Sequence, residues 1–394
     1  MLVVLGSVGL ARFAFGMILP TMALDLGLGY RAQGVLGASY FLGYLTIVAL
    51  MPWAAPCLGS KRLCVGGLFV VSAGLCAMAM GTSSTYLYAS YFVVGLGSGA
   101  AFIGAMSLPS FWFHPSHRAR AAGIATAGAG VGILLSGLVI PAIPEAFDMA
   151  NWQLTWLVFG VTTGFFALWA LVVLKDRPAE LGITPYGRAD VVPATSGAPK
   201  PRVQRVRLFL IHLGVIYTIF AATGLTYATF IVTTMVDSFS LPTAKAGLLW
   251  AGVGGLSIFS GALFGSVSDR FGHRAGMSCA LAVQAVAYGL VATNTGLSGL
   301  YVSIVLFGLS AWSMPSIVAA AAGDFLGPKK VASGFAILTT MFAAGQVAGP
   351  ASAGVLADWA GSFGLSYGIA AALNVAAVLL CLALRLPSRA ASNS

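Results

Sequence analysis

The chain has 394 residues, of which 59% are hydrophobic and only 8% are charged, and its mean hydropathy is +0.94. Soluble domains carry roughly 25% charged residues and disordered chains have low hydrophobicity, so both classes are excluded. The composition indicates a polytopic membrane protein, and the 50 glycines fit helices that pack through small residues.

Twelve apolar runs are long enough to cross a hydrocarbon core that takes roughly 20 helical residues. The first run lacks a basic segment before it and is too long for a cleavable signal, so we expect it to be a membrane helix. The predicted spans cover residues 2–26, 33–56, 62–82, 85–113, 119–142, 152–174, 207–236, 243–267, 275–294, 298–323, 330–356 and 363–384.

The connections between these spans are short except for residues 175–206, a polar stretch rich in Pro, Gly, Arg and Lys. Such a composition is typical of a linker. We therefore predict an N-terminal six-helix bundle at 1–174, a cytoplasmic linker at 175–206 and a C-terminal six-helix bundle at 207–394.

The basic residues orient these spans. With the N-terminus inside, 17 of the 20 Lys and Arg residues fall in inner loops, Arg31 and Lys245 fall in outer loops, and the remaining one is Arg12. The positive-inside rule therefore predicts that both termini are cytoplasmic. The net charge of +10 is then a topology signal that attracts anionic lipid headgroups, and we expect no nucleic-acid partner. The five cysteines have no paired spacing, so we predict neither a metal site nor a disulfide framework.

The two halves repeat each other at a shift of about 212 residues. Gly59 lies in the inner turn after the second span, Gly272 lies in the turn after the eighth, and a basic residue follows each glycine two positions later. A parallel repeat predicts a substrate site between two pseudo-symmetric six-helix bundles, near mid-membrane and reached alternately from each side.

The second of these turns carries the motif Gly265-x-x-x-Asp269-Arg270-x-Gly272-x-Arg274. With twelve spans and a long central loop, this motif makes the whole chain resemble the major facilitator superfamily of secondary transporters. The resemblance implies an all-α membrane protein of twelve transmembrane helices in two six-helix bundles. It also implies that Asp269, Arg270 and Arg274 help to latch the inner helix ends.

The first-half turn departs from this motif, because Pro56 and Cys57 stand where Asp and Arg would be. We therefore expect a latch there to be weak or built differently. Within the superfamily, Ala-Arg-Phe-Ala-Phe-Gly at 11–16 resembles the start of YbfB/YjiJ-like bacterial transporters. Asp-Arg-Pro-Ala-Glu-Leu-Gly at 176–182 resembles the linker of oxalate/formate and monocarboxylate carriers.

Arg12 is the most informative single residue. It lies about ten residues into the first span, so roughly 15 Å deep at 1.5 Å per residue, where a charge costs at least about 2.5 kcal/mol. We interpret it as a cation that binds an anion in the central cavity, since its fork suits carboxylates. The alternative is a guanidinium bonded to helix carbonyls or snorkelling to the inner face. The repeat favours binding, because the matching region near Gly224 is uncharged.

Polar and aromatic residues in mid-span are further candidates for the cavity wall, with ordinary packing as the alternative for each. Tyr and Trp present an apolar face with one donor, which suits a small organic substrate. Our candidate substrate-binding set is Arg12, Tyr40, Tyr44, Tyr217, Tyr227, Trp312 and Gln346.

Three more residues are candidates for roles in gating or in proton transfer. Gly349 and Pro350 predict a helix kink that a bundle tolerates, or a gating hinge. His212 can carry protons near neutral pH, or be a satisfied interfacial residue.

Several absences narrow the function. No Asp or Glu lies in the middle of a span, the antiporter signature of the fifth helix is missing, and no nucleophile–base set is visible. We therefore expect neither an enzyme nor a cofactor. The predicted function is secondary transport of a small organic anion, a carboxylate, across a bacterial inner membrane by a monomer working through alternating access.

Coupling and rival functions stay open at this point. Uptake of an anion against an inside-negative potential needs proton symport or exchange. The proton would travel on the substrate's own carboxylate or on His212. The rivals are efflux of drugs or hydrophobic metabolites, which the many aromatics permit and Arg12 disfavours, and a non-transporting membrane sensor on the same fold.

Overall fold

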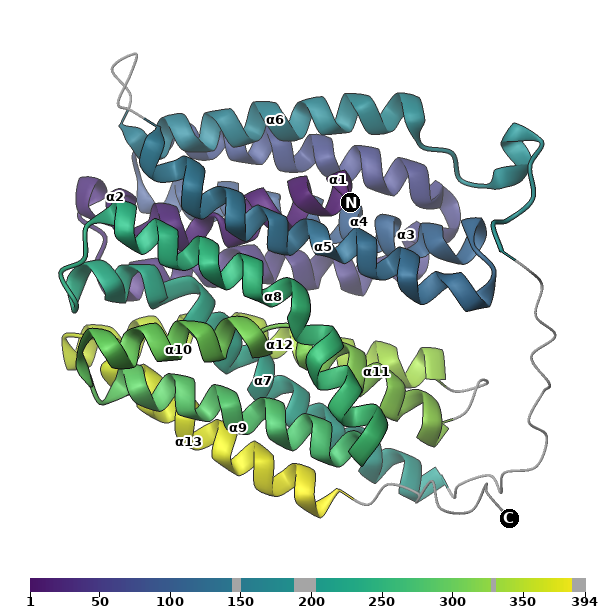
Figure 1. The fold of residues 1–394 in the computed structure, drawn as a ribbon. Helices are drawn as coiled ribbons and strands as arrows, with labels where there is room; N and C mark the ends of the chain where they lie inside the picture. The colour runs from purple at the N-terminus through teal and green to yellow at the C-terminus, as the bar shows by residue number, and fades with distance from the viewer. Residues whose placement is uncertain (144–149, 188–202, 327–330, 385–394) are drawn as a thin grey trace. The chain divides into compact units, whose positions relative to one another are not determined.

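The computed structural model describes residues 1–143, 150–187, 203–326 and 331–384, and it is nearly all helical (Figure 1). Residues 188–202 of the predicted linker lie outside the described part. The long helices are α2 (Phe15–Leu26), α3 (Tyr30–Ala79), α4 (Ser84–Trp112), α5 (Pro115–Val139), α6 (Asn151–Val173), α7 (Val203–Asp237), α8 (Thr243–Phe271), α9 (His273–Ala292), α10 (Gly296–Ser310), α11 (Ser313–Leu326), α12 (Val331–Ala360) and α13 (Gly364–Ala383).

The predicted membrane helices are confirmed. Among the described residues, eleven helical segments are long and apolar enough to cross a membrane. They include two spans within α3, which runs through the turn at Gly59, and one span made of α10 and α11 together. The remaining predicted span, 330–356, corresponds to α12, a 30-residue helix whose Gln346 and Pro350 lie among several glycines and lower its hydropathy.

Two spans have interrupted backbones. The first is built from α1 (Leu2–Val4), the π-helix η1 (Leu5–Phe13) and α2, and the amide of Ala14 reaches back five residues to the carbonyl of Gly9 at 3.2 Å. The tenth breaks between α10 and α11, where the freed amide of Trp312 donates to Ser260 Oγ at 2.9 Å. Such departures inside a membrane helix are tolerated where protein groups satisfy the backbone, and they are frequent at functional sites.

The chain divides into two compact units. Unit 1 comprises residues 1–194, 226–255 and 350–363, and unit 2 comprises residues 195–225, 256–349 and 364–394. Unit 1 therefore holds the first six spans together with parts of α7, α8 and α12. The predicted division into bundles at 1–174 and 207–394 stays a prediction.

Within unit 1, α7 and α12 pack directly on α2 and α3. A Cβ added at Gly16 would lie 2.6 Å from the carbonyl oxygen of Ala228, and one added at Gly34 would lie 2.7 Å from that of Pro350. Only glycine permits backbones to approach so closely. At the end of this contact, Tyr30 donates a hydrogen bond to Asp237 Oδ2 at 3.2 Å.

Unit 2 has its own apolar core, formed by residues of α7, α8, α9, α11, α12 and α13. Phe209, Leu213, Met277, Ile317 and Leu338 are among its buried members. This core packs together the helices that carry or flank the candidate residues of unit 2, namely His212, Tyr217, Trp312 and Gln346.

Candidate functional site

Arg12 lies in η1, where its guanidinium is flanked by aromatic rings. Its Cζ is 4.9 Å from the ring centroid of Phe13 and 4.6 Å from that of Phe41 on α3. Nε and Nη2 are shielded from solvent and have no hydrogen-bond partner among the described residues. Aromatic faces stabilise a cation, but they leave its donors unused.

The carbonyl groups around Arg12 are bound by other side chains. Tyr40 Oη and Ser98 Oγ lie within hydrogen-bonding distance of each other and of the carbonyl oxygen of Ser7. Tyr91 donates to the carbonyl of Ala11 at 3.0 Å. These contacts hold the π-helix against α3 and α4, so the alternative of a guanidinium bonded to these two carbonyls is not the arrangement observed.

The other predicted residues of unit 1 differ in what they can offer a ligand. Tyr44 is half-buried and lies close enough to Arg12 to interact with it electrostatically. Tyr40 is buried and its hydroxyl is engaged with Ser7 and Ser98, while Tyr227 is fully buried on α7. Tyr44 is therefore the better candidate for contact with a substrate, and Tyr40 is better placed to support the helix that carries Arg12.

Two further residues belong to this cluster and were not among our sequence candidates. Tyr91 lies 5.1 Å, centroid to centroid, from Tyr40 and 6.0 Å from Trp156 of α6. Trp156 is fully buried, and its Nε1 has no hydrogen-bond partner among the described residues. Sequence reasoning missed Trp156 because it lies only four residues after the start of its predicted span, 152–174, where a Trp is typical of an interfacial anchor.

In unit 2, Gln346 of α12 is the counterpart of Arg12 in its lack of partners. Its side chain is 1% exposed, and neither Nε2 nor Oε1 has a hydrogen-bond partner in the described part of the chain. A buried amide left unpaired costs roughly 1–3 kcal/mol per group. Such an amide is a candidate for binding a ligand that supplies both an acceptor and a donor.

The region that matches Arg12 in the repeat is polar but neutral. Asn374 of α13 donates to Thr223 Oγ1 at 2.9 Å and keeps its Oδ1 without a partner among the described residues. Tyr288 of α9 donates to Gln284 Oε1 at 3.2 Å and lies beside Gly224. The side chains named here, like the sequence near Gly224, carry no charge.

The remaining predicted residues of unit 2 lie in packed surroundings. Tyr217 stacks on Phe342, with ring centroids 4.4 Å apart. His212 Nε2 lies 2.9 Å from the carbonyl oxygen of Leu380, which fixes Nε2 as the donor when the ring is neutral. Trp312 lies at the break between α10 and α11, the kind of interruption that borders binding sites in transporters.

The predicted latch motif ends α8 and begins α9. The Arg270 guanidinium carbon lies 5.4 Å from the ring centroid of Phe271. Ser268 and His273, which are neighbours of the predicted latch residues Asp269, Arg270 and Arg274, make further polar contacts in this turn.

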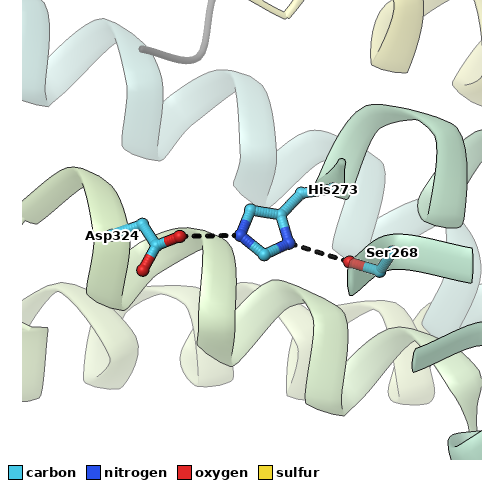
Figure 2. Close-up of polar contacts among 3 residues, drawn as sticks. All are labelled: Ser268, His273 and Asp324. Atoms are coloured by element: carbon cyan, nitrogen blue, oxygen red, sulfur yellow. Dashed lines mark hydrogen bonds and ion pairs between the residues drawn. The ribbon is translucent and has the colours of Figure 1, made fainter. Parts of the chain in front are cut away.

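In Figure 2, Ser268 Oγ lies 2.8 Å from His273 Nδ1, and His273 Nε2 lies 3.0 Å from Asp324 Oδ2. His273 thereby ties the turn to α11.

In the first-half turn the structure shows a contact with an acid from another segment. Asp176, from the start of the linker, accepts a hydrogen bond from the backbone amide of Lys61 at 2.7 Å. Its carboxylate oxygens would lie 3.2 and 3.3 Å from a Cβ added at Gly59. The acid missing from the turn itself is thus supplied by a segment more than 100 positions later in the chain.

No group of three or more His, Cys, Asp or Glu side chains that could hold a metal ion occurs among the described residues.

Several known transporters are similar to this chain in sequence. The chain is 24% identical to the "Putative tartrate transporter" of Agrobacterium vitis, covering 94% of this chain and 88% of the relative. It is 25% identical to the "Hexuronate transporter" of Bacillus subtilis (strain 168), covering 94% and 89%. It is 26% identical to the "Oxalate:formate antiporter" of Oxalobacter formigenes, covering 64% and 57%.

Solved structures share the fold. A bacterial homolog of the human lysosomal transporter Spinster, solved in an inward-facing and unoccupied conformation, has a TM-score of 0.71 at 14% identity, covering 97% of this chain and 94% of that chain. The nucleoside transporter NupG also has a TM-score of 0.71 at 14% identity, covering 97% and 98%.

The family model described as "Uncharacterised MFS-type transporter YbfB" matches residues 4–386, which is nearly the whole chain. Together with the helical fold, this match shows that the chain is a multi-pass membrane protein that belongs to the YbfB-type family of major facilitator transporters.

Proposed function

We propose that this protein is a secondary active transporter that moves a small organic anion, a carboxylate, across the bacterial inner membrane by alternating access. Two six-helix halves, 1–174 and 207–394, joined by the linker 175–206, would form the moving parts. The excess of basic residues in one set of loops supports cytoplasmic termini.

The observation that carries this proposal is the guanidinium of Arg12. A charged group at this depth is costly, and its Nε and Nη2 donors have no partner among the described residues. Hydrogen bonds to charged groups contribute roughly 1.5–3 kcal/mol each. A carboxylate that arrives from outside the protein supplies both the charge and the acceptors that Arg12 lacks.

Gln346 refines the class of carboxylate. Its unpaired amide presents a donor and an acceptor, and a hydroxyl group complements both. Two relatives are named for tartrate and hexuronate, which are carboxylates that bear hydroxyl groups. We therefore favour a hydroxylated carboxylate over an apolar one.

Coupling to protons completes the proposal. Uptake of one negative charge against an inside-negative potential costs roughly 2.3 kcal/mol per 100 mV. A proton carried on the substrate's own carboxylate, or on His212, would cancel this cost. Gly349 and Pro350 would serve as the hinge, since α12 passes from unit 2 to unit 1 between these two residues.

The direct test is uptake of a labelled carboxylate panel by proteoliposomes, with and without an imposed pH gradient. We expect saturable uptake of at least one hydroxylated carboxylate, and faster uptake when the lumen is alkaline. Uptake of a lipophilic cation with no uptake of any carboxylate would replace this proposal with drug efflux.

Variants at Arg12 locate the anion site. Arg12→Ala should weaken apparent affinity by about 100-fold, because a charge-assisted hydrogen bond is lost. The apparent affinity of Arg12→Lys should lie between that of the wild type and that of Arg12→Ala, since an ammonium keeps the charge but not the forked geometry of the guanidinium. Arg31→Gln, an exposed arginine at the start of α3, is the matched control and should transport normally. Normal transport by both Arg12 variants would disprove the anion site.

A further inference from the structure

An open groove lies where the linker begins, beside the end of α4. Phe111, Arg177, Pro178 and Ile183 line it, and its volume is about 480 Å³. That is large enough for part of a small amphipathic molecule. All of these residues belong to unit 1.

The linker segment that forms one wall is firmly attached. Trp112 Nε1 donates to the carbonyl of Lys175 at 3.1 Å. Tyr186 donates its amide to the carbonyl of Trp112 at 2.9 Å, and its own carbonyl accepts from the amide of His114 at 3.0 Å. These bonds, with the contact of Asp176 to Lys61, hold the segment against α3, the end of α4 and the start of α5. They therefore fix the position of this wall of the groove.

The groove lies at the level where the membrane spans end. α4 ends at Trp112 and α6 ends at Val173. Apolar side chains of the groove wall are nevertheless exposed here: Ile183 is 52% exposed and Phe111 is 42% exposed. Contiguous exposed apolar surface marks a site of interaction, and at this level the partner at hand is the acyl region of the bilayer.

The charge of the groove wall selects the headgroup. The guanidinium carbon of Arg177 lies 5.7 Å from the ring centroid of Phe111, and no carboxylate pairs with it in the described part of the chain. Asp176 is engaged with the amide of Lys61, and Glu180 accepts from the amide of Arg177 itself. The two nearby acids are therefore used on backbone groups, and the side chain of Arg177 is left for an anion.

We propose that this groove binds an anionic phospholipid, with its phosphate on Arg177 and an acyl chain along Phe111 and Ile183. The positive-inside orientation would place the site in the cytoplasmic leaflet, where anionic lipids attract basic segments at roughly 1 kcal/mol per residue. The site is separate from Arg12, so it does not depend on which substrate is carried.

Lipid binding to the purified full-length protein tests this inference. Native mass spectrometry would count lipids retained after addition of phosphatidylglycerol or phosphatidylcholine to the detergent solution. We expect preferential retention of phosphatidylglycerol, about five-fold lower in Arg177→Gln and unchanged in Arg31→Gln. Ile183→Asn, an exposed position, should also reduce retention through the apolar wall while the protein stays folded by size exclusion.

Three results would overturn the inference. Equal retention of phosphatidylcholine would remove the role of charge. An equal loss in Arg31→Gln would show a non-specific effect of net charge. Displacement of the lipid by glycerol phosphate alone, at equal concentration, would show that the groove binds a soluble phosphate rather than a lipid.

Discussion

The two inner turns of the repeat have the same backbone but different polar partners. Gly59 (φ 75°, ψ 165°) and Gly272 (φ 88°, ψ 159°) both adopt a conformation that is open almost only to glycine. The residue after each glycine bonds a later helix of its own half. Ser60 Oγ lies 2.7 Å from Ser107 Oγ of α4, and His273 Nε2 lies 3.0 Å from Asp324 of α11.

The difference between the turns concerns charge. The first turn has a neutral hydroxyl pair and receives its acid from the linker, as Asp176. The second turn carries its own titratable pair, His273 and Asp324, with Ser268 on the other ring nitrogen (Figure 2). The repeat has thus kept the chain reversal, which depends on one glycine, while the groups that stabilise it come from whichever segment lies nearby.

The largest effect should come from the glycines. Gly59→Ala and Gly272→Ala should each destabilise the protein by about 1–3 kcal/mol, because alanine is strained at these angles. Gly59→Ala should be the worse, since its methyl group would meet Asp176 while nothing lies within 4 Å at Gly272. Thermal unfolding in detergent measures both. The helix glycines Gly66 and Gly265, where an added methyl group also meets nothing within 4 Å, are the controls and should tolerate alanine.

Loss of His273, in the second turn, should have the next largest effect on stability. His273→Ala removes two hydrogen bonds and leaves the buried Ser268 hydroxyl to find a new acceptor, so about 1–2 kcal/mol should be lost. Ser268→Ala removes only one of these bonds and should cost about half as much. Equal melting temperatures for His273→Ala and wild type would show that the turn is held by its backbone alone.

Loss of Asp176, the acid at the first turn, should lower the stability slightly less than loss of His273. Asp176→Ala removes an acceptor at the start of a helix, which typically costs about 1 kcal/mol. Asp176→Asn keeps an acceptor and loses only the charge near the helix N-terminus, so its cost should be about 0.3–1 kcal/mol. Glu180→Gln, in the same segment, is the control. A larger loss of stability in Glu180→Gln than in Asp176→Ala would contradict the view that Asp176 stabilises this turn through its hydrogen bond with the amide of Lys61.

Sequence reasoning predicted the repeated turn but not its partners. The glycines, the basic residues and the missing Asp and Arg of the first copy are local patterns, and local patterns can be read in one sequence. Asp176 reaches Lys61 across 115 positions, a contact that depends on how the linker folds back on α3. His273 was adjacent to the predicted latch residues, but its partner Asp324 lies 51 positions away.

The same limit applies to the candidate site. Arg12 could be identified because a charge inside an apolar span is a local anomaly. The π-helix that carries it was not predicted, since it depends on Tyr40, Ser98 and Tyr91 binding the carbonyls of Ser7 and Ala11 from other helices. Gln346 was a candidate because it is a polar residue in mid-span, whereas the isolation of its amide is a property of tertiary packing.

The smallest effect should be that of the charged partner in the second turn. Asp324 is 53% exposed, and exposed ion pairs contribute roughly 0.2–1 kcal/mol. Asp324→Asn keeps an acceptor for His273 Nε2, so only the electrostatic part should be lost. A double-mutant cycle with His273→Gln isolates this part, and the coupling should shrink as salt rises. A coupling above about 2 kcal/mol would mean that Asp324 is desolvated more deeply than its exposure indicates, and the two inner turns would then differ in energy as well as in chemistry.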